Sequence, residues 1–280
     1  MADDTADGHK MPLLDHLVEL RSRLLKSVIA LLLAFLACFF FAEEIYAFLT
    51  EPLAVILRER REDPRMIFTA LTEVFFTYVK VAFFAAAFIT CPVFLTQLWL
   101  FVAPGLYKKE QKALAPFLVA TPVLFFIGGA LVYYVIFPLA AEFLIGFSEV
   151  PSGEGQLGVE LEAKVSEYLS LIMSLIFAFG LCFQLPVIMT LLARVGLATS
   201  AGMAAKRKYA VVAVFVAAAV LTPPDPVSQI SLAIPIILLY EISIYMAKLV
   251  ERKRARDEAA EEDVDDDDSE SGNDVTPSDS

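Results

Sequence analysis

The sequence predicts an all-α, polytopic membrane protein with six transmembrane helices. Of the 280 residues, 58 % are hydrophobic and the mean hydropathy is +0.66, whereas soluble domains are roughly 45–50 % apolar. The apolar residues are gathered in long uncharged runs, and a helix of about 20 apolar residues is what crosses the hydrocarbon core of a bilayer.

Six uncharged runs mark the expected spans. They are residues 27–42, 81–107, 113–141, 168–193, 209–224 and 226–240. The second span is expected to begin near Glu73, and the sixth to continue past Glu241 to about Ala247. The last two runs are short and are separated only by a proline-rich turn, so one re-entrant hairpin is an alternative. Basic residues on both flanks favour two short spans.

The basic residues predict the orientation of the chain. Counted along the alternating connections, 16 of the 22 lysines and arginines lie on the side of both termini, and five lie on the other side. Cytoplasmic connections carry the excess of Lys and Arg. Both termini are therefore expected in the cytoplasm.

Further features are expected around the spans. Apolar residues at helical spacing on both sides of Pro52 predict interfacial helices that cap the outer side. Prolines within the spans favour curved helices and a concave bundle; they are Pro92, Pro116, Pro122, Pro138, Pro186 and Pro235. Residues 1–250 are thus expected to form the membrane domain. Residues 251–280 hold 13 of the 34 acids and are expected to form a disordered acidic tail.

No pattern typical of an enzyme, a metal site or a cofactor site occurs in the sequence. The three cysteines, Cys38, Cys91 and Cys182, lie in separate apolar runs without metal-ligand spacing. Nucleotide-binding loops and nucleophile motifs are absent from the sequence. We therefore expect no catalysis, no cofactor and no bound metal.

Two acids in basic surroundings are the best candidates for a binding site. Glu19 lies in the segment HLVELRSR at 16–23, and Glu110 in YKKEQK at 107–112, both near the membrane surface on the same predicted side. Each acid also has an ordinary interpretation: Glu19 can pair with Arg23 four residues on, and Glu110 can interact with the N-terminal dipole of the third span. Two carboxylates on one face could accept two arginines through paired hydrogen bonds.

Polar residues inside the spans are further candidates, because their burial in a bilayer is costly. Gln184 lies near the middle of the fourth span and Gln229 follows the proline-rich turn; helix packing is the competing interpretation for both. Lys80 and Glu241 lie near span ends. Together these residues leave open an ion- or proton-coupled solute transporter, and a membrane scaffold without cargo is a third possibility.

Several motifs in order resemble the TatC family, the polytopic subunit of the twin-arginine protein translocase. They are HLVELRSRL at 16–24, QLWLFVAPGLYKKE at 97–110, FPLA at 137–140, FGLCFQLP at 179–186 and LTPPDPVSQ at 221–229. The resemblance covers about residues 14–247 and excludes the acidic tail.

This resemblance implies a signal-peptide receptor and core translocase subunit. Such a protein exports folded proteins across the bacterial cytoplasmic (inner) membrane, using the proton-motive force. The implied ligands are twin-arginine signal peptides, and the implied partners are TatA-like and TatB-like single-span subunits in a multi-copy complex within the lipid bilayer. No nucleic acid is implied.

The resemblance also implies roles for individual residues. Glu19 and Glu110 are implied to contact the arginine pair, with Arg21 and Phe101 at the same inner-face site. The residues implied to serve partner docking, the outer-side turn or the cap are Gln184, Thr222, Gln229, Pro52, Pro223, Pro224 and Asp225. Many family members have a glutamate where this chain has Gln184, and a neutral amide there cannot titrate.

Overall fold

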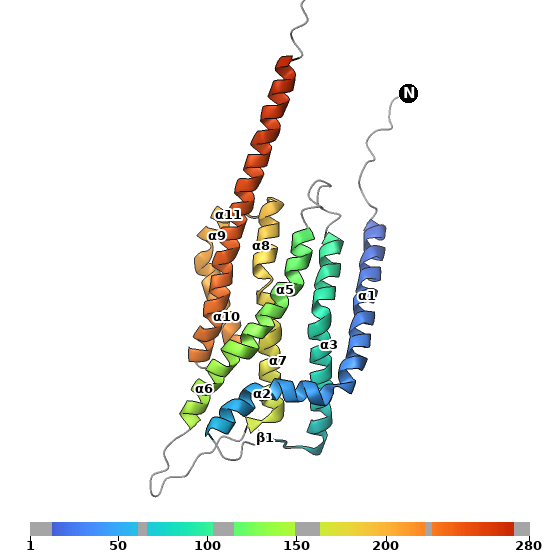
Figure 1. Ribbon diagram of the computed structural model, residues 1–280, viewed down its shortest axis with the longest axis vertical. Helices are drawn as coiled ribbons and strands as arrows, with labels where there is room; N and C mark the ends of the chain where they lie inside the picture. The colour runs from blue at the N-terminus through green and yellow to red at the C-terminus, as the bar shows by residue number, and fades with distance from the viewer. Residues whose placement is uncertain (1–12, 61–65, 103–114, 149–162, 222–225, 272–280) are drawn as a thin grey trace, which may run out of the picture.

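Long helices lying side by side make up most of the protein (Figure 1). The computed structural model describes residues 13–60, 66–102, 115–148, 163–221 and 226–271. The helices are α1 (Leu13–Phe40), α2 (Ala42–Arg60), α3 (Leu71–Val102), α5 (Ala115–Leu131), α6 (Phe137–Ser148), α7 (Val165–Cys182), α8 (Leu185–Arg194), α9 (Ser200–Ala205), α10 (Arg207–Leu221) and α11 (Pro226–Ser271). A π-helix, η3 (Val132–Ile136), joins α5 to α6, and the short strands β1 (Met66–Ile67) and β2 (Ala163–Lys164) pair in parallel.

Helical segments that are long and apolar enough to cross a membrane confirm the predicted class. Five are found in the described residues, namely Val18–Phe40, Leu71–Phe101, Phe117–Gly146, Val165–Arg194 and Gln229–Arg256. The remaining candidate, α10, has 15 residues, which at 1.5 Å per residue make about 22 Å, less than a hydrocarbon core of about 30 Å. A sixth full span therefore stays a prediction.

The long helices form an open row. Helix α1 packs mainly on α3, α3 on α5, α5 on α7, α8 on α11, and α11 on α10. Helix α1 is thus at one edge, and its large apolar side chains are widely exposed, such as Leu33 at 64 %. In a bilayer these side chains contact lipid. The first residues of α1 and the last residues of α11 lie at the same end of the helix bundle, at the top of Figure 1.

Two of the predicted prolines disturb their helices in different ways. Pro186 stands at the start of α8, and the fourth span breaks between Cys182 and Leu185, with Gln184 as the N-cap residue of α8. Before Pro138 the chain instead forms η3, in which the Phe137 N–H donates to the Val132 carbonyl. A proline ring clashes with the carbonyl four residues earlier, and the extra residue in a π turn relieves that clash.

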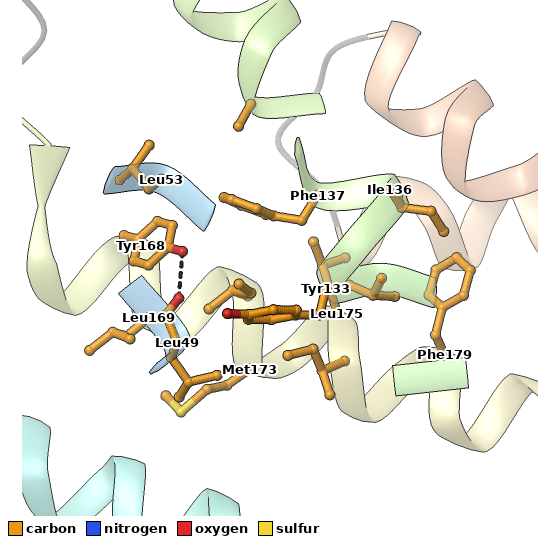
Figure 2. Packing of buried hydrophobic residues seen from close by; sticks show 14 of the residues in the cluster. Leu49, Leu53, Tyr133, Ile136, Phe137, Tyr168, Leu169, Met173, Leu175 and Phe179 are labelled. Carbon is orange, nitrogen blue, oxygen red and sulfur yellow. Dashed lines mark hydrogen bonds between the residues drawn. The ribbon is translucent and has the colours of Figure 1, made fainter. Parts of the chain in front are cut away.

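Helix α2 lies across the long helices at the opposite end of the bundle, toward the bottom of Figure 1, as expected of the predicted cap. It differs from the prediction in being one helix with Pro52 inside it. Pro52 has no N–H to donate to the Phe48 carbonyl, and the Tyr133 hydroxyl of η3 donates to that carbonyl instead, at 2.7 Å. The Tyr168 hydroxyl of α7 donates to the neighbouring Leu49 carbonyl, also at 2.7 Å (Figure 2). These bonds tie the cap to the core.

The C-terminal segment also differs from the prediction. Helix α11 continues without a break to Ser271, whereas the sequence predicts a disordered tail from residue 251. The residues just beyond the span are mostly Glu, Arg, Lys and Ala, which favour helix, so nothing there stops a helix that is already formed. Residues 272–280 lie outside the described part.

Candidate functional site

Glu19 lies near the start of α1, at the end of the helix bundle where α3 ends and α5 begins (Figure 1). The Arg23 Nε and Nη2 atoms donate to Glu19 Oε1 at 2.9 and 2.6 Å. Arg23 Nη1 donates to Gln97 Oε1 of α3 at 3.3 Å. The predicted pair four residues apart is therefore present, and it connects α1 with α3.

The geometry of this pair leaves one carboxylate oxygen available. Both bonds from Arg23 end on Oε1, and within the described residues Glu19 Oε2 accepts no hydrogen bond. The side chains of Glu19 and Arg23 are 26 % and 22 % exposed. A partly exposed ion pair contributes only about 0–1 kcal/mol to stability. Its clearer effect is to hold the carboxylate of Glu19 in one orientation at the α1–α3 contact.

The other residues predicted for this site have different outcomes. Arg21 is exposed, and because it lies two residues after Glu19 it is rotated by about 200° around the helix. It does not join the Glu19 contact. Phe101 is half-buried on α3, one turn beyond Gln97 and therefore on the same side of that helix. Glu110 lies outside the described residues.

A second polar group links three helices inside the bundle. Trp99 Nε1 of α3 donates to Thr121 Oγ1 of α5 at 3.1 Å, and Gln184 Nε2 donates to the Thr121 carbonyl at 2.9 Å. Gln184 is 3 % exposed, and its Oε1 has no hydrogen-bond partner. The Gln184 amide, which is predicted to need hydrogen-bond partners, thus has one for its nitrogen, on the neighbouring helix α5, and none for its oxygen. The sequence alone does not single out Trp99, Thr121 or Gln97.

The remaining predicted polar residues make contacts between neighbouring helices. Gln229 Nε2 donates to the Phe215 carbonyl at 3.0 Å and thereby joins α11 to α10, which agrees with a packing role. Arg207 binds Glu241 with two contacts, Nε to Oε1 at 2.7 Å and Nη2 to Oε2 at 2.8 Å. Because the charge of Glu241 is balanced by Arg207, this residue does not favour the alternative of an ion- or proton-coupled solute transporter.

Some predicted positions cannot be compared with the structure. Thr222, Pro223, Pro224 and Asp225 lie outside the described residues. Among the residues that are described, no group of three His, Cys, Asp or Glu side chains could hold a metal ion.

Known proteins are similar to this chain in sequence and in fold. A family model described as Sec-independent protein translocase protein (TatC) matches residues 15–235. The Sec-independent protein translocase protein TatC of Magnetococcus marinus is 51 % identical over 266 residues, covering 92 % of this chain and 94 % of the relative. The protein of the same name from Escherichia coli (strain K12) is 39 % identical over 248 residues, covering 88 % and 92 %.

Solved structures agree with the sequence comparison. A crystal structure of the twin-arginine translocase receptor TatC superimposes with a TM-score of 0.71 at 35 % identity, covering 84 % of this chain and 99 % of that one. A second crystal structure of that receptor, in DDM, gives a TM-score of 0.72 at 35 % identity, covering 83 % and 99 %.

Proposed function

The chain belongs to the TatC family of Sec-independent protein translocases, and we propose that it is the signal-peptide receptor and core subunit of a twin-arginine translocase. In this proposal it exports folded proteins across the bacterial cytoplasmic membrane, with the proton-motive force as the energy source. Its work is transport, without a catalytic residue or a cofactor of its own.

The observation that carries the proposal is the orientation of Glu19. Arg23 occupies one oxygen of the carboxylate and leaves the other available at a partly exposed contact between two helices. A guanidinium from a signal peptide could donate to this free oxygen in a charge-assisted hydrogen bond. The aromatic ring of Phe101 would provide an apolar surface on the same side of α3 as Gln97.

Glu110 is proposed as the carboxylate for the second arginine. It is five residues before Ala115, the first residue of α5, and five residues of extended chain reach at most about 18 Å. The start of α5 lies at the same end of the helix bundle as the start of α1, which carries Glu19 (Figure 1). The length of the connection is therefore compatible with a site that uses both acids.

The proposal includes an orientation and partners. The excess of basic residues at the end that carries both termini supports a cytoplasmic location for that end. TatA-like and TatB-like single-span subunits are proposed to dock at α10 and α11, in the region of Gln184, Thr222 and Gln229. Helix α10 exposes a stripe of residues at helical spacing that a partner helix could cover, namely Tyr209, Val212, Val216 and Val220.

Photo-crosslinking tests the site. A twin-arginine signal peptide with a photo-crosslinker beside its arginines is mixed with membranes containing the full chain. Glu19→Gln and Glu110→Gln should each lower the apparent affinity by about 10- to 100-fold, because a hydrogen bond to a charged group contributes about 1.5–3 kcal/mol. Glu51→Gln is the matched control, since Glu51 is a half-exposed acid of α2 that is paired with an arginine, at the other end of the protein.

Two results would contradict different parts of the proposal. Crosslinking that survives the double replacement of Glu19 and Glu110 would refute the site while leaving the family function intact. Export of twin-arginine cargo that is undisturbed by deletion of this chain would refute the function itself.

A further inference from the structure

We propose that the base of α11 carries a binding site for the phosphate group of an anionic membrane lipid, formed by Lys248, Arg252 and Arg256. The site faces away from the helix row. It goes beyond the proposed receptor function and does not depend on the Glu19 site.

The first argument is the height of these residues in the bilayer. The outward side of α11 exposes Leu238, Ile242, Tyr245 and Leu249, with exposed fractions of 42–63 %. The span begins at Gln229, and about 20 residues from there cross the hydrocarbon core, which brings the chain to Lys248. The basic residues therefore begin where the lipid-facing apolar stripe ends, at the level of the lipid headgroups.

The second argument is their arrangement on the helix. Lys248, Arg252 and Arg256 follow each other at intervals of four residues and are all exposed, so they form one stripe. Among the residues whose side chains the structure describes, which on α11 end at Arg256, no ion pair or side-chain hydrogen bond involves any of the three. Of the nearby acids, Glu251 is three residues after Lys248, and its carboxylate is bound to Ser200 of α9.

The third argument is that α11 is held in a fixed rotation at this level. Glu251 Oε1 accepts the Ser200 N–H at 2.6 Å, and Glu251 Oε2 accepts the Ser200 hydroxyl at 2.5 Å. Arg254 Nη1 donates to the carbonyl of Arg194, the last residue of α8, at 3.4 Å. An acid at the start of α9 and a base at the end of α8 both match the helix dipoles.

These contacts separate two functions on one helical turn of α11. The inward side chains, Glu251 and Arg254, bind the α8–α9 connection, and the outward ones remain available. Because Glu251 is occupied, it does not neutralise the outward stripe. Guanidinium and ammonium groups at headgroup level bind phosphate through charge-assisted hydrogen bonds, and each contributes about fivefold in affinity for an anionic surface.

The test compares three triple variants of the full chain. Phosphatidylglycerol is titrated into the purified protein in neutral detergent, and bound lipid is counted by native mass spectrometry. K248Q/R252Q/R256Q should weaken binding by about 100-fold, from three charges at about fivefold each. The matched control, K26Q/K206Q/K208Q, removes three exposed lysines from the same predicted membrane side and should change binding by less than about threefold, since none of them belongs to the stripe. K248R/R252K/R256K keeps the charges and should bind like the unchanged chain.

Two outcomes would overturn the proposal. Equal weakening in K248Q/R252Q/R256Q and in the matched control would mean that the net charge of this membrane side alone attracts the lipid. Displacement of phosphatidylglycerol by millimolar inorganic phosphate would assign the stripe to a free phosphate instead of a membrane lipid.

Discussion

The hydrogen bond from Tyr133 to the Phe48 carbonyl, four residues before Pro52, gives a quantitative prediction about the α2 cap. Pro52 leaves the Phe48 carbonyl without its helical donor, and the Tyr133 hydroxyl donates to that carbonyl at 2.7 Å. Tyr133 is 8 % exposed, so the Tyr133→Phe variant leaves a carbonyl unsatisfied in a protected place. Such a loss costs about 1–3 kcal/mol. The stacking of the Phe48 and Tyr133 rings, with centroids 4.4 Å apart, is kept in this variant.

Replacement of the proline should remove most of this cost. In a Pro52→Ala background the backbone N–H of the substituted residue can donate to the Phe48 carbonyl. This carbonyl then has a donor even when the Tyr133 hydroxyl is removed. Tyr133→Phe should then cost less than about 0.5 kcal/mol, which gives a coupling energy of about 1–2 kcal/mol in the double-mutant cycle, within the range for residues in contact.

Unfolding of the full chain in mixed dodecyl maltoside and SDS micelles measures the four free energies of unfolding. Tyr134→Phe is the control, because Tyr134 is adjacent and 68 % exposed, and it should be close to neutral. If Tyr133→Phe is equally destabilising in the unchanged chain and in the Pro52→Ala background, the hydroxyl does not substitute for the missing helical donor, and the explanation of the cap is wrong.

Three further predictions concern the polar contacts. Glu251→Gln should destabilise the α8–α9 connection by about 1 kcal/mol, and limited proteolysis between residues 195 and 206 should become faster; unchanged cleavage would contradict the clamp. Gln184→Glu should be less stable at neutral than at acidic pH, because only a protonated carboxyl can donate to the Thr121 carbonyl, and pH-dependent unfolding measures this. Arg23→Gln should weaken signal-peptide binding about tenfold by releasing Glu19, while Arg23→Lys should restore part of it.

Five of the six predicted spans are matched by helices of the described residues, because hydrophobicity and length are local properties that the bilayer imposes on each helix separately. The sequence predicts less about how the helices are disturbed. A proline indicates that a hydrogen bond is lost, and yet Pro186 stands where α8 begins, Pro138 follows a π turn, and Pro52 stays inside α2. The outcome depends on which neighbour supplies a donor, and for Pro52 that donor is 85 residues from the carbonyl it serves.

The candidate site shows the same division. The Glu19–Arg23 pair follows from a spacing of four residues, so the sequence predicts it. The contact of Arg23 with Gln97 joins residues 74 apart, and that of Gln184 with Thr121 joins residues 63 apart. Both depend on how helices are arranged in the row, which one sequence does not specify. Residues 251–271 form helix where the sequence predicts a disordered tail, because helix propensity beyond the span outweighs the repulsion of its charges.

The polar residues within the chain differ in what they leave available to a ligand. Gln229 and Glu241 bind neighbouring helices through their side chains, and these contacts stabilise the row. Gln184 has an unpaired oxygen, but at 3 % exposure it is out of reach of a ligand unless helices separate. Glu19 combines a fixed orientation, partial exposure and an unoccupied oxygen. Recognition of a cationic segment should therefore take place at the α1–α3 contact, where binding requires no break in the packing of the interior.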